Sequence, residues 1–259
     1  MNWFEALILG LVQGLTEFLP VSSSGHLEIG KYFFGIDHEA GFGYTLAVHG
    51  ATVLSTIVVF RKEIIELLRG ALEFKMNWQT RYILLIMWSM IPVGLAGFFL
   101  KDEVEGLFDG NLVMVGAMLL VTAALLFSTR FFKDQGKDIT FLSAFVIGIA
   151  QALAVIPGIS RSGATISTGM ILGISRDKVA GFSFLMVLVP VIGANLLEFV
   201  GSEASPGSTG ISEILIGFVA SFFAGFLACK VMIALVKRSK MLWFSVYCLI
   251  LGLLSIILG

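Results

Sequence analysis

The chain has 259 residues, of which 57% are hydrophobic and only 14% are charged. Soluble domains contain about 45–50% apolar and 25% charged residues, so this composition excludes an ordinary soluble protein. The net charge of −1 argues against binding to nucleic acid. Because the apolar segments are continuous and do not alternate with polar residues, we predict an all-α polytopic membrane protein and not a β-barrel.

The first predicted element is a broken apolar segment, residues 3–34. Its apolar beginning runs into a Pro/Gly/Ser break, after which a second short apolar piece follows. Broken backbone is tolerated at membrane depth only where protein or a water-filled cavity covers it, so we predict a re-entrant helix–loop–helix hairpin. Residues 139–173 have the same character. Six continuous segments are long enough for transmembrane helices, and they cover residues 42–60, 82–100, 112–129, 179–200, 214–236 and 241–258.

The two broken segments are copies of each other. LGLVQGLTEFLPVSSSG (Leu9–Gly25) aligns without gaps with IGIAQALAVIPGISRSG (Ile147–Gly163) at an offset of 138 residues. The chain is therefore predicted to be a single membrane domain, 1–259, made of two repeats at about 1–132 and 139–259. Each repeat has one hairpin and three crossings, and an odd number of crossings inverts the second repeat relative to the first.

The basic residues indicate the orientation of the repeats. Lys and Arg gather in the connections after the first, third and fifth predicted spans, whereas loops 101–111 and 201–212 together contain one Lys and no Arg. The positive-inside rule then places both termini outside. The first hairpin is expected to enter from outside and the second from the cytoplasmic side. The two cysteines, Cys229 and Cys248, fall in apolar segments and are expected to be buried, without a disulfide or metal.

One helical stripe of the first hairpin carries polar residues. Gly10, Gln13, Gly14 and Glu17 follow the spacing i, i+3, i+4 and i+7. Such a stripe can be a packing seam in which the glycines allow close approach and Gln13 bonds across it. An ionisable group in a membrane segment is costly, so Glu17 is a candidate functional residue.

The break itself contains Ser22, Ser23 and Ser24. Serine hydroxyls can cap a helix at such a break, which explains one of them. Three in a row also supply donors for an oxyanion such as phosphate. His26 follows, and across the bend it can return beside Glu17, although a lone histidine is often a satisfied core residue. We interpret His49, alone in the first span, as structural or supporting.

The second hairpin reads PGISRSGAT and places Arg161 between Ser160 and Ser162, with Thr165 one turn on. The arginine can form an ion pair with Glu17, or its guanidinium can hold phosphate in a bidentate fork completed by the hydroxyls. The two copies differ at these charged positions, since one holds the acid and the histidine and the other the arginine. This division favours an asymmetric reaction centre.

The segments QGLTEFLPVSSSGHL (Gln13–Leu27) and PGISRSGATIS (Pro157–Ser167) resemble the bacterial undecaprenyl-pyrophosphate phosphatase family of the bacitracin-resistance type. The resemblance covers essentially the whole chain. It implies hydrolysis of undecaprenyl diphosphate to undecaprenyl phosphate and inorganic phosphate, which regenerates the lipid carrier for cell-wall synthesis. It also implies a multi-pass enzyme of the inner membrane, dependent on Mg²⁺ or Ca²⁺, with a site opening to the outer face.

The family's motifs fall on named positions of this chain. Its acidic E/QxxxE motif falls on Gln13 and Glu17, where many members have a second glutamate, so a two-carboxylate metal site is in doubt. The resemblance implies that Glu17 binds the cation and that His26 is a general base or the nucleophile, with Ser23 as the rival nucleophile. The residues expected to hold the diphosphate are Ser22, Ser24, Ser160, Arg161, Ser162 and Thr165.

A different class of function stays open. Inverted repeats with re-entrant hairpins are also a carrier architecture, so a lipid-phosphate flippase or transporter is the alternative to a phosphatase, and a scaffold subunit is a third. The sequence does not fix the oligomeric state, and a homodimer is compatible with it.

Overall fold

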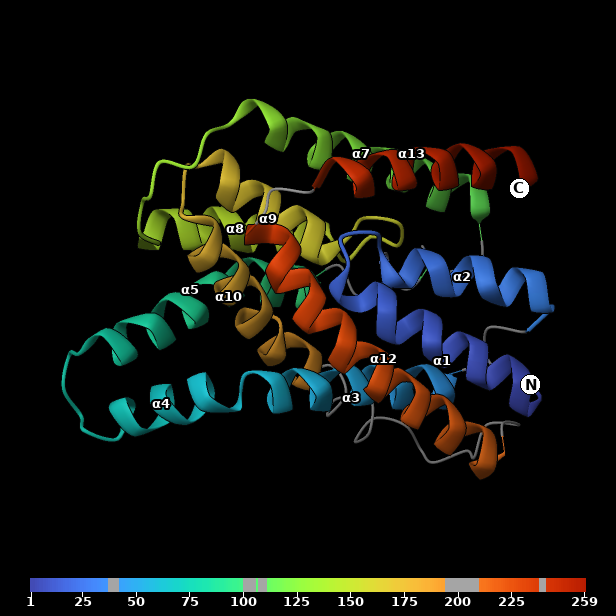
Figure 1. Cartoon of the computed structure of the whole chain (residues 1–259), viewed down its shortest axis with the longest axis horizontal. Coiled ribbons are helices and arrows are strands. Elements are labelled where there is room, and N and C mark those ends of the chain that lie inside the picture. Colours follow the sequence, from blue (N-terminus) through green and yellow to red (C-terminus); the bar gives the residue numbers. More distant parts are fainter. Residues whose placement is uncertain (37–41, 100–105, 107–110, 194–209, 238–240) are drawn as a thin grey trace.

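A computed structural model describes residues 1–36, 42–99, 106, 111–193, 210–237 and 241–259. In this part of the chain the fold is all-helical, with no strand and one isolated β-bridge between Lys137 and Ile174. Figure 1 shows the helices, which are α1 (Trp3–Phe18), α2 (Ser23–Phe34), α3 (Phe42–Val59), α4 (Arg61–Ala71), α5 (Trp78–Phe99), α7 (Leu112–Ser128), η2 (Thr129–Phe131), α8 (Phe141–Leu153), α9 (Arg161–Ile171), α10 (Arg176–Met186), α12 (Ile211–Lys237) and α13 (Met241–Leu258).

Both broken segments form a helix, a break and a second helix. Asn2 and Thr140 begin the first helices, α1 and α8, each with a reciprocal capping box. Each break ends at a serine cap that starts the second helix, α2 or α9. The two helices of each pair pack against each other. The sequence therefore placed both helix–break–helix units correctly.

Four described helices, α5, α7, α12 and α13, are long and apolar enough to cross a membrane, or five if α3 and α4 form one bent span. Their bounds lie within a few residues of the predicted segments. Helix α4 is bent by 74° from α3 and carries the basic residues that follow the first predicted span. The chain is thus a multi-pass helical membrane protein.

The predicted span 179–200 is wrong as one continuous helix. Helix α10 ends at Met186, residue 187 is a turn, and residues 188–193 are helical again. Pro190 explains the interruption, because a proline ring clashes with the carbonyl four residues before it, here that of Met186. Residues 194–200 lie outside the described part of the chain.

Glycines allow the first helix of each hairpin to lie directly on a long helix of the other half. A Cβ built on Gly10 of α1 would lie 2.5 Å from the carbonyl oxygen of Gly217 on α12. The aligned residue of α8, Gly148, would place its Cβ 2.2 Å from the carbonyl oxygen of Ser89 on α5. The packing-seam interpretation of Gly10 is confirmed, since no side chain fits at either contact.

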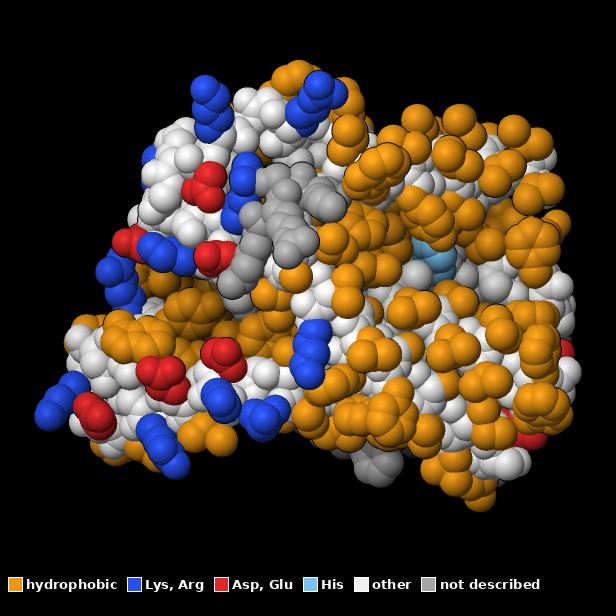
Figure 2. Space-filling model, viewed as in Figure 1, with side chains coloured by type: hydrophobic (Ala, Val, Ile, Leu, Met, Phe, Trp, Pro, Cys, Tyr) orange, Lys and Arg blue, Asp and Glu red, His pale blue; other side chains and the backbone are white. Residues whose placement is uncertain are grey.

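The two ends of the molecule differ in charge. Figure 1 shows the N- and C-termini at one end and the connection from α4 to α5 at the other. On the face drawn in Figure 2, Lys and Arg gather at the α4 end, while hydrophobic side chains cover the part nearer the termini. Lipid-facing helices expose large apolar side chains, such as Trp243 and Ile257 of α13. As expected, Cys229 and Cys248 are buried and free.

Candidate active site

The start of each second hairpin helix is capped in the same way. The hydroxyl of Ser22 accepts from the backbone N–H of Gly25 at 3.3 Å, and that of Ser160 accepts from Gly163 at 3.1 Å. Ser22 has φ of 69°, a left-handed conformation that is unfavourable for a residue with a side chain. The capping interpretation thus holds for these two aligned serines. It leaves the remaining N-terminal N–H groups of α2 and α9 facing the two breaks.

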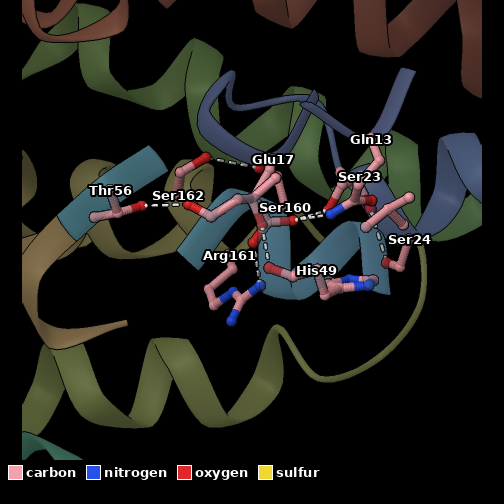
Figure 3. Close-up of polar contacts among 12 residues, drawn as sticks. Gln13, Glu17, Ser23, Ser24, His49, Thr56, Ser160, Arg161 and Ser162 are labelled. Atoms are coloured by element: carbon pink, nitrogen blue, oxygen red, sulfur yellow. Dashed lines mark hydrogen bonds and ion pairs between the residues drawn. The ribbon is translucent and has the colours of Figure 1, made fainter. Parts of the chain in front are cut away.

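Glu17, near the end of α1, connects the two hairpins. Its Oε1 accepts a hydrogen bond from Nη2 of Arg161 at 2.6 Å. Its Oε2 accepts from the hydroxyl of Ser23 at 2.6 Å and from Nε2 of Gln13 at 2.8 Å. Figure 3 shows these side chains converging. The structure therefore joins the acid of one repeat to the arginine of the other, 144 residues apart in sequence.

Burial makes this contact strong. The side chain of Glu17 is only 8% exposed and that of Arg161 is 27% exposed. A buried carboxylate is stable only when it is paired and hydrogen-bonded, and three donors surround this one. Among the described residues, the bond to Glu17 is the guanidinium's one hydrogen bond. Its other N–H groups remain able to bind an anion.

The remaining serines line the two breaks. Ser24 lies 3.3 Å from the hydroxyl of Ser22, and Ser162 lies 3.4 Å from that of Ser160. The hydroxyl of Ser162 also donates to the carbonyl of Leu19 at 3.2 Å. This bond crosses from the second hairpin to the first, so the two breaks lie against each other.

Thr165 bonds to the backbone of its own helix and to α10. Its hydroxyl donates to the carbonyl of Arg161 at 2.8 Å and lies 2.6 Å from the hydroxyl of Ser183 on α10. Thr165 is almost fully buried. In this structure it links α9 to Ser183, a residue of α10 that lines the pocket beside Glu17.

His26 is not bonded to Glu17. Its Nδ1 lies 2.7 Å from the carbonyl oxygen of Ser22, and its Nε2 lies 2.7 Å from the hydroxyl of Tyr247 on α13. Both ring nitrogens therefore have partners other than the carboxylate. The expectation that the bend returns His26 to Glu17 is wrong, because the first turn of α2 directs Ser23 to Glu17 and His26 to α13.

His49, which the sequence interpretation left as structural or supporting, lies near Glu17. It lies among the site residues in Figure 3. Its Nδ1 bonds to the carbonyl of Thr45 at 2.8 Å. Thr52 and Thr56 lie three and seven residues further along α3 and line a pocket beside Glu17, although His49 itself does not line it. This i, i+3, i+7 polar spacing in an apolar span was the available signal.

A narrow pocket lies beside Glu17. It has two chemically different kinds of lining. The polar lining residues are Glu17, Thr52, Thr56, Arg161, Ser162 and Ser183. The apolar lining residues are Phe18, Val53, Phe184, Val187, Leu188 and Val191. Such a pocket suits a ligand with an anionic head and an apolar tail.

The residues present offer a modest site for a divalent cation. The described residues contain no group of three His, Cys, Asp or Glu that could hold a metal. However, Oε1 of Gln13 is buried without a hydrogen-bond partner in the described structure, and its amide bonds to Glu17. One carboxylate and one amide oxygen fit a hard cation that completes its shell with water and phosphate oxygens.

Fold and site together define a multi-pass helical membrane protein with a buried carboxylate–hydroxyl–guanidinium centre between two repeated hairpins. The family model described as bacitracin resistance protein BacA matches residues 6–254. The chain belongs to this family.

Full-length relatives agree with this assignment. The chain is 51% identical over 263 residues to an undecaprenyl-diphosphatase of Bacteroides fragilis, covering 100% of this chain and 99% of that protein. It is 48% identical to an undecaprenyl-diphosphatase of Christiangramia forsetii, covering 99% and 98%. An archaeal relative of the same name, from Methanosphaera stadtmanae, is 39% identical and covers 100% and 99%.

Proposed function

We propose that this chain is an undecaprenyl-diphosphate phosphatase of the bacterial inner membrane. It hydrolyses undecaprenyl diphosphate to undecaprenyl phosphate and inorganic phosphate. The observation that carries the proposal is the carboxylate of Glu17, bonded at once to the Ser23 hydroxyl and the Arg161 guanidinium at the polar lining of an otherwise apolar pocket. Full-length relatives named for this reaction support it.

The first chemical step follows from the bond between Ser23 and Glu17. Glu17 takes the hydroxyl proton as Ser23 Oγ attacks the terminal phosphorus. The bond from that phosphorus to the bridging oxygen breaks, and Glu17 passes the proton to the departing undecaprenyl phosphate. His26 then acts as general base for the water that hydrolyses the phosphoserine and releases inorganic phosphate. Ser23 is preferred to His26 as the nucleophile because Ser23, and not His26, bonds to the carboxylate.

The charge of the diphosphate requires donors that do not move during the reaction. The free N–H groups of Arg161 and the N-terminal N–H groups of α2 and α9 supply them, with Ser22, Ser24, Ser160 and Ser162 beside them. Thr165 acts through its bond to the Arg161 carbonyl, which fixes the first turn of α9. The apolar lining of the pocket receives the beginning of the prenyl chain.

Gln13 and Glu17 are the residues that would hold a divalent cation, Mg²⁺ or Ca²⁺. When bound there together with the substrate, the ion would neutralise phosphate charge in the transition state. With one carboxylate in place of two, we expect this chain to bind the free cation weakly, on the order of millimolar, and to bind it more tightly with the substrate.

The membrane arrangement that fits these data has six transmembrane helices and two re-entrant hairpins in inverted repeats. Both termini lie outside, and the site opens to the outer face. In support, the basic residues gather at the end opposite the termini (Figure 2).

The decisive experiment measures phosphate release from prenyl diphosphates by the purified protein in detergent. The wild type is expected to release phosphate, while Glu17→Ala and Arg161→Ala, checked for folding, are not. Acid-stable phosphate on Ser23 after rapid quenching supports the serine route. Acid-labile phosphate on His26 would instead show that His26 is the nucleophile. The absence of any phosphoenzyme would indicate that water attacks the phosphorus directly.

If the wild type releases no phosphate with any divalent cation, the phosphatase proposal fails. The paired hairpins would then favour a lipid-phosphate flippase, which reconstituted vesicles carrying a fluorescent prenyl phosphate would detect. If neither substitution changes either activity, the chain is a scaffold.

A further inference from the structure

A second polar contact lies between α2 and α13, apart from the pocket. The imidazole of His26 lies parallel to the Tyr247 ring, with an interplanar angle of 7° and ring centroids 5.6 Å apart. The Tyr247 hydroxyl lies 2.7 Å from Nε2, across 221 residues of sequence. Tyr247 is 46% exposed on the apolar surface of α13, where its hydroxyl meets this one polar group among the described residues.

The partners of the imidazole determine which nitrogen carries the proton. The carbonyl oxygen of Ser22 can only accept, so Nδ1 is the nitrogen that donates to it. In the neutral ring Nε2 then carries no proton, so it accepts a hydrogen bond from the Tyr247 hydroxyl. When Nε2 takes a proton, the same hydroxyl can accept from it. Tyr247 can therefore remain bonded to His26 in both protonation states.

We propose that Tyr247 is a positioning residue for His26, and this inference rests on the proposed phosphatase function. Tyr247 holds the ring in one orientation and one tautomer, so that Nε2 stays the proton-exchanging nitrogen. Ser23 and His26 lie three residues apart on α2 and therefore project from neighbouring positions of one helical face. Without the hydroxyl, the imidazole can rotate about its χ2 bond and lose this alignment.

The stacking of the two rings offers a simpler explanation, in which Tyr247 only fills space against α2. The two explanations make different predictions for Tyr247→Phe, which keeps the ring and removes the hydroxyl alone. Packing alone predicts no change in turnover. Positioning predicts a fall of roughly 10-fold in kcat, a part of the about 10²–10⁴-fold that general acid–base catalysis contributes, with KM unchanged.

The experiment compares kcat and KM for prenyl diphosphate hydrolysis with ¹⁵N NMR of the histidine rings. The proteins are the wild type, Tyr247→Phe, His26→Gln and a matched control, Tyr32→Phe. Tyr32 lies on α2 and is exposed, and its hydroxyl makes no hydrogen bond within the described structure. His26→Gln identifies the His26 signals among the three histidines.

A lower kcat with a shifted Nε2 signal in Tyr247→Phe, and neither change in Tyr32→Phe, supports the inference. Wild-type kcat in Tyr247→Phe overturns it, whether or not the Nε2 signal moves, and leaves the phosphatase function standing. A wild-type protein that hydrolyses no prenyl diphosphate overturns the proposed function and the positioning role together.

Discussion

Glu17 and Arg161 are the residues on which the site depends. Each is the other's charged partner in a largely buried environment. Glu17→Gln keeps the shape but leaves a guanidinium with no carboxylate, which costs about 3–5 kcal/mol for a buried pair. We expect a large fall in phosphate release, at least about 100-fold, and a lower unfolding midpoint. Thermal unfolding in detergent separates the two effects.

Arg161→Lys is the matched control for this prediction. Lysine keeps the charge but presents a single ammonium in place of the planar fork. We expect its unfolding midpoint to approach that of the wild type, while phosphate release stays strongly reduced. If Arg161→Lys is fully active, the guanidinium does not hold the diphosphate.

His49 provides a second test at the same scale. Because His49 lies among the site residues near Glu17 (Figure 3), His49→Leu is expected to lower phosphate release by roughly 10-fold. Ser255→Ala serves as the control, since the Ser255 hydroxyl bonds only to the carbonyl of Leu251 within its own helix in the described structure, and Ser255 does not line the pocket. Phosphate release by this control variant should stay within about 2-fold of the wild-type rate. Equal activity of His49→Leu and wild type would return His49 to a purely structural role.

The sequence identified the pairing of Glu17 and Arg161 as one of two alternatives, because a buried charge needs a partner and few were available. The sequence could not predict where the His26 side chain points, because the direction of a side chain in the first turn after a break depends on the backbone of that break. Ser22 adopts positive φ there. His49 was set aside because it was read alone, without the threonines that share its helical face.

At the scale of elements, the aligned glycines of α1 and α8 determine how closely the halves pack. Gly148→Ala places a methyl group against the backbone of Ser89, where nothing flexible can move away. We expect destabilisation of about 1–3 kcal/mol, seen as a lower unfolding midpoint. Gly94→Ala on α5 is the control, because a Cβ there meets no atom within 4 Å. That variant should be as stable as wild type or slightly more so.

The repeat, the two breaks and most helix bounds could be predicted because they depend on local signals, which are serine caps, glycines and continuous apolar stretches. The interruption of α10 depends on Pro190, a local signal outweighed by the length of the apolar run. The only signal in the sequence for the 74° bend between α3 and α4 is the group of basic residues that follows it.

At the scale of the whole molecule, the charge distribution predicts which end faces the cytoplasm. A chain lacking Cys229 and Cys248 can carry one new cysteine, at Lys133 in the connection between the repeats or at Gly259. In intact cells, an impermeant thiol reagent is expected to label Gly259→Cys and not Lys133→Cys. Labelling of Lys133→Cys is expected to reach the level of Gly259→Cys only after the membrane is opened. The reverse pattern would invert the proposed topology.

The connection between the halves also predicts how stability depends on pH. Asp138 forms an ion pair with Lys178 at the start of α10, and Asp134 accepts hydrogen bonds from the backbone of Gly136 and Arg176. The hydrogen bond and charge of Lys178 lower the pKa of Asp138, and the Gly136 and Arg176 N–H groups lower the pKa of Asp134, in each case below the ordinary value of 3.8.

An acid whose pKa is lower in the folded protein than in the unfolded chain stabilises the fold above its unfolded pKa. That contribution is lost as the pH falls through the folded pKa, so the loss begins near pH 4 and continues below it. Both groups are exposed, so the effect is small. We expect the double variant Asp134→Ala, Asp138→Ala to be less stable than wild type at pH 7, and the difference to shrink toward pH 3. Unfolding midpoints across this range measure it, and a difference that grows on acidification would show that these carboxylates do not hold the connection to α10.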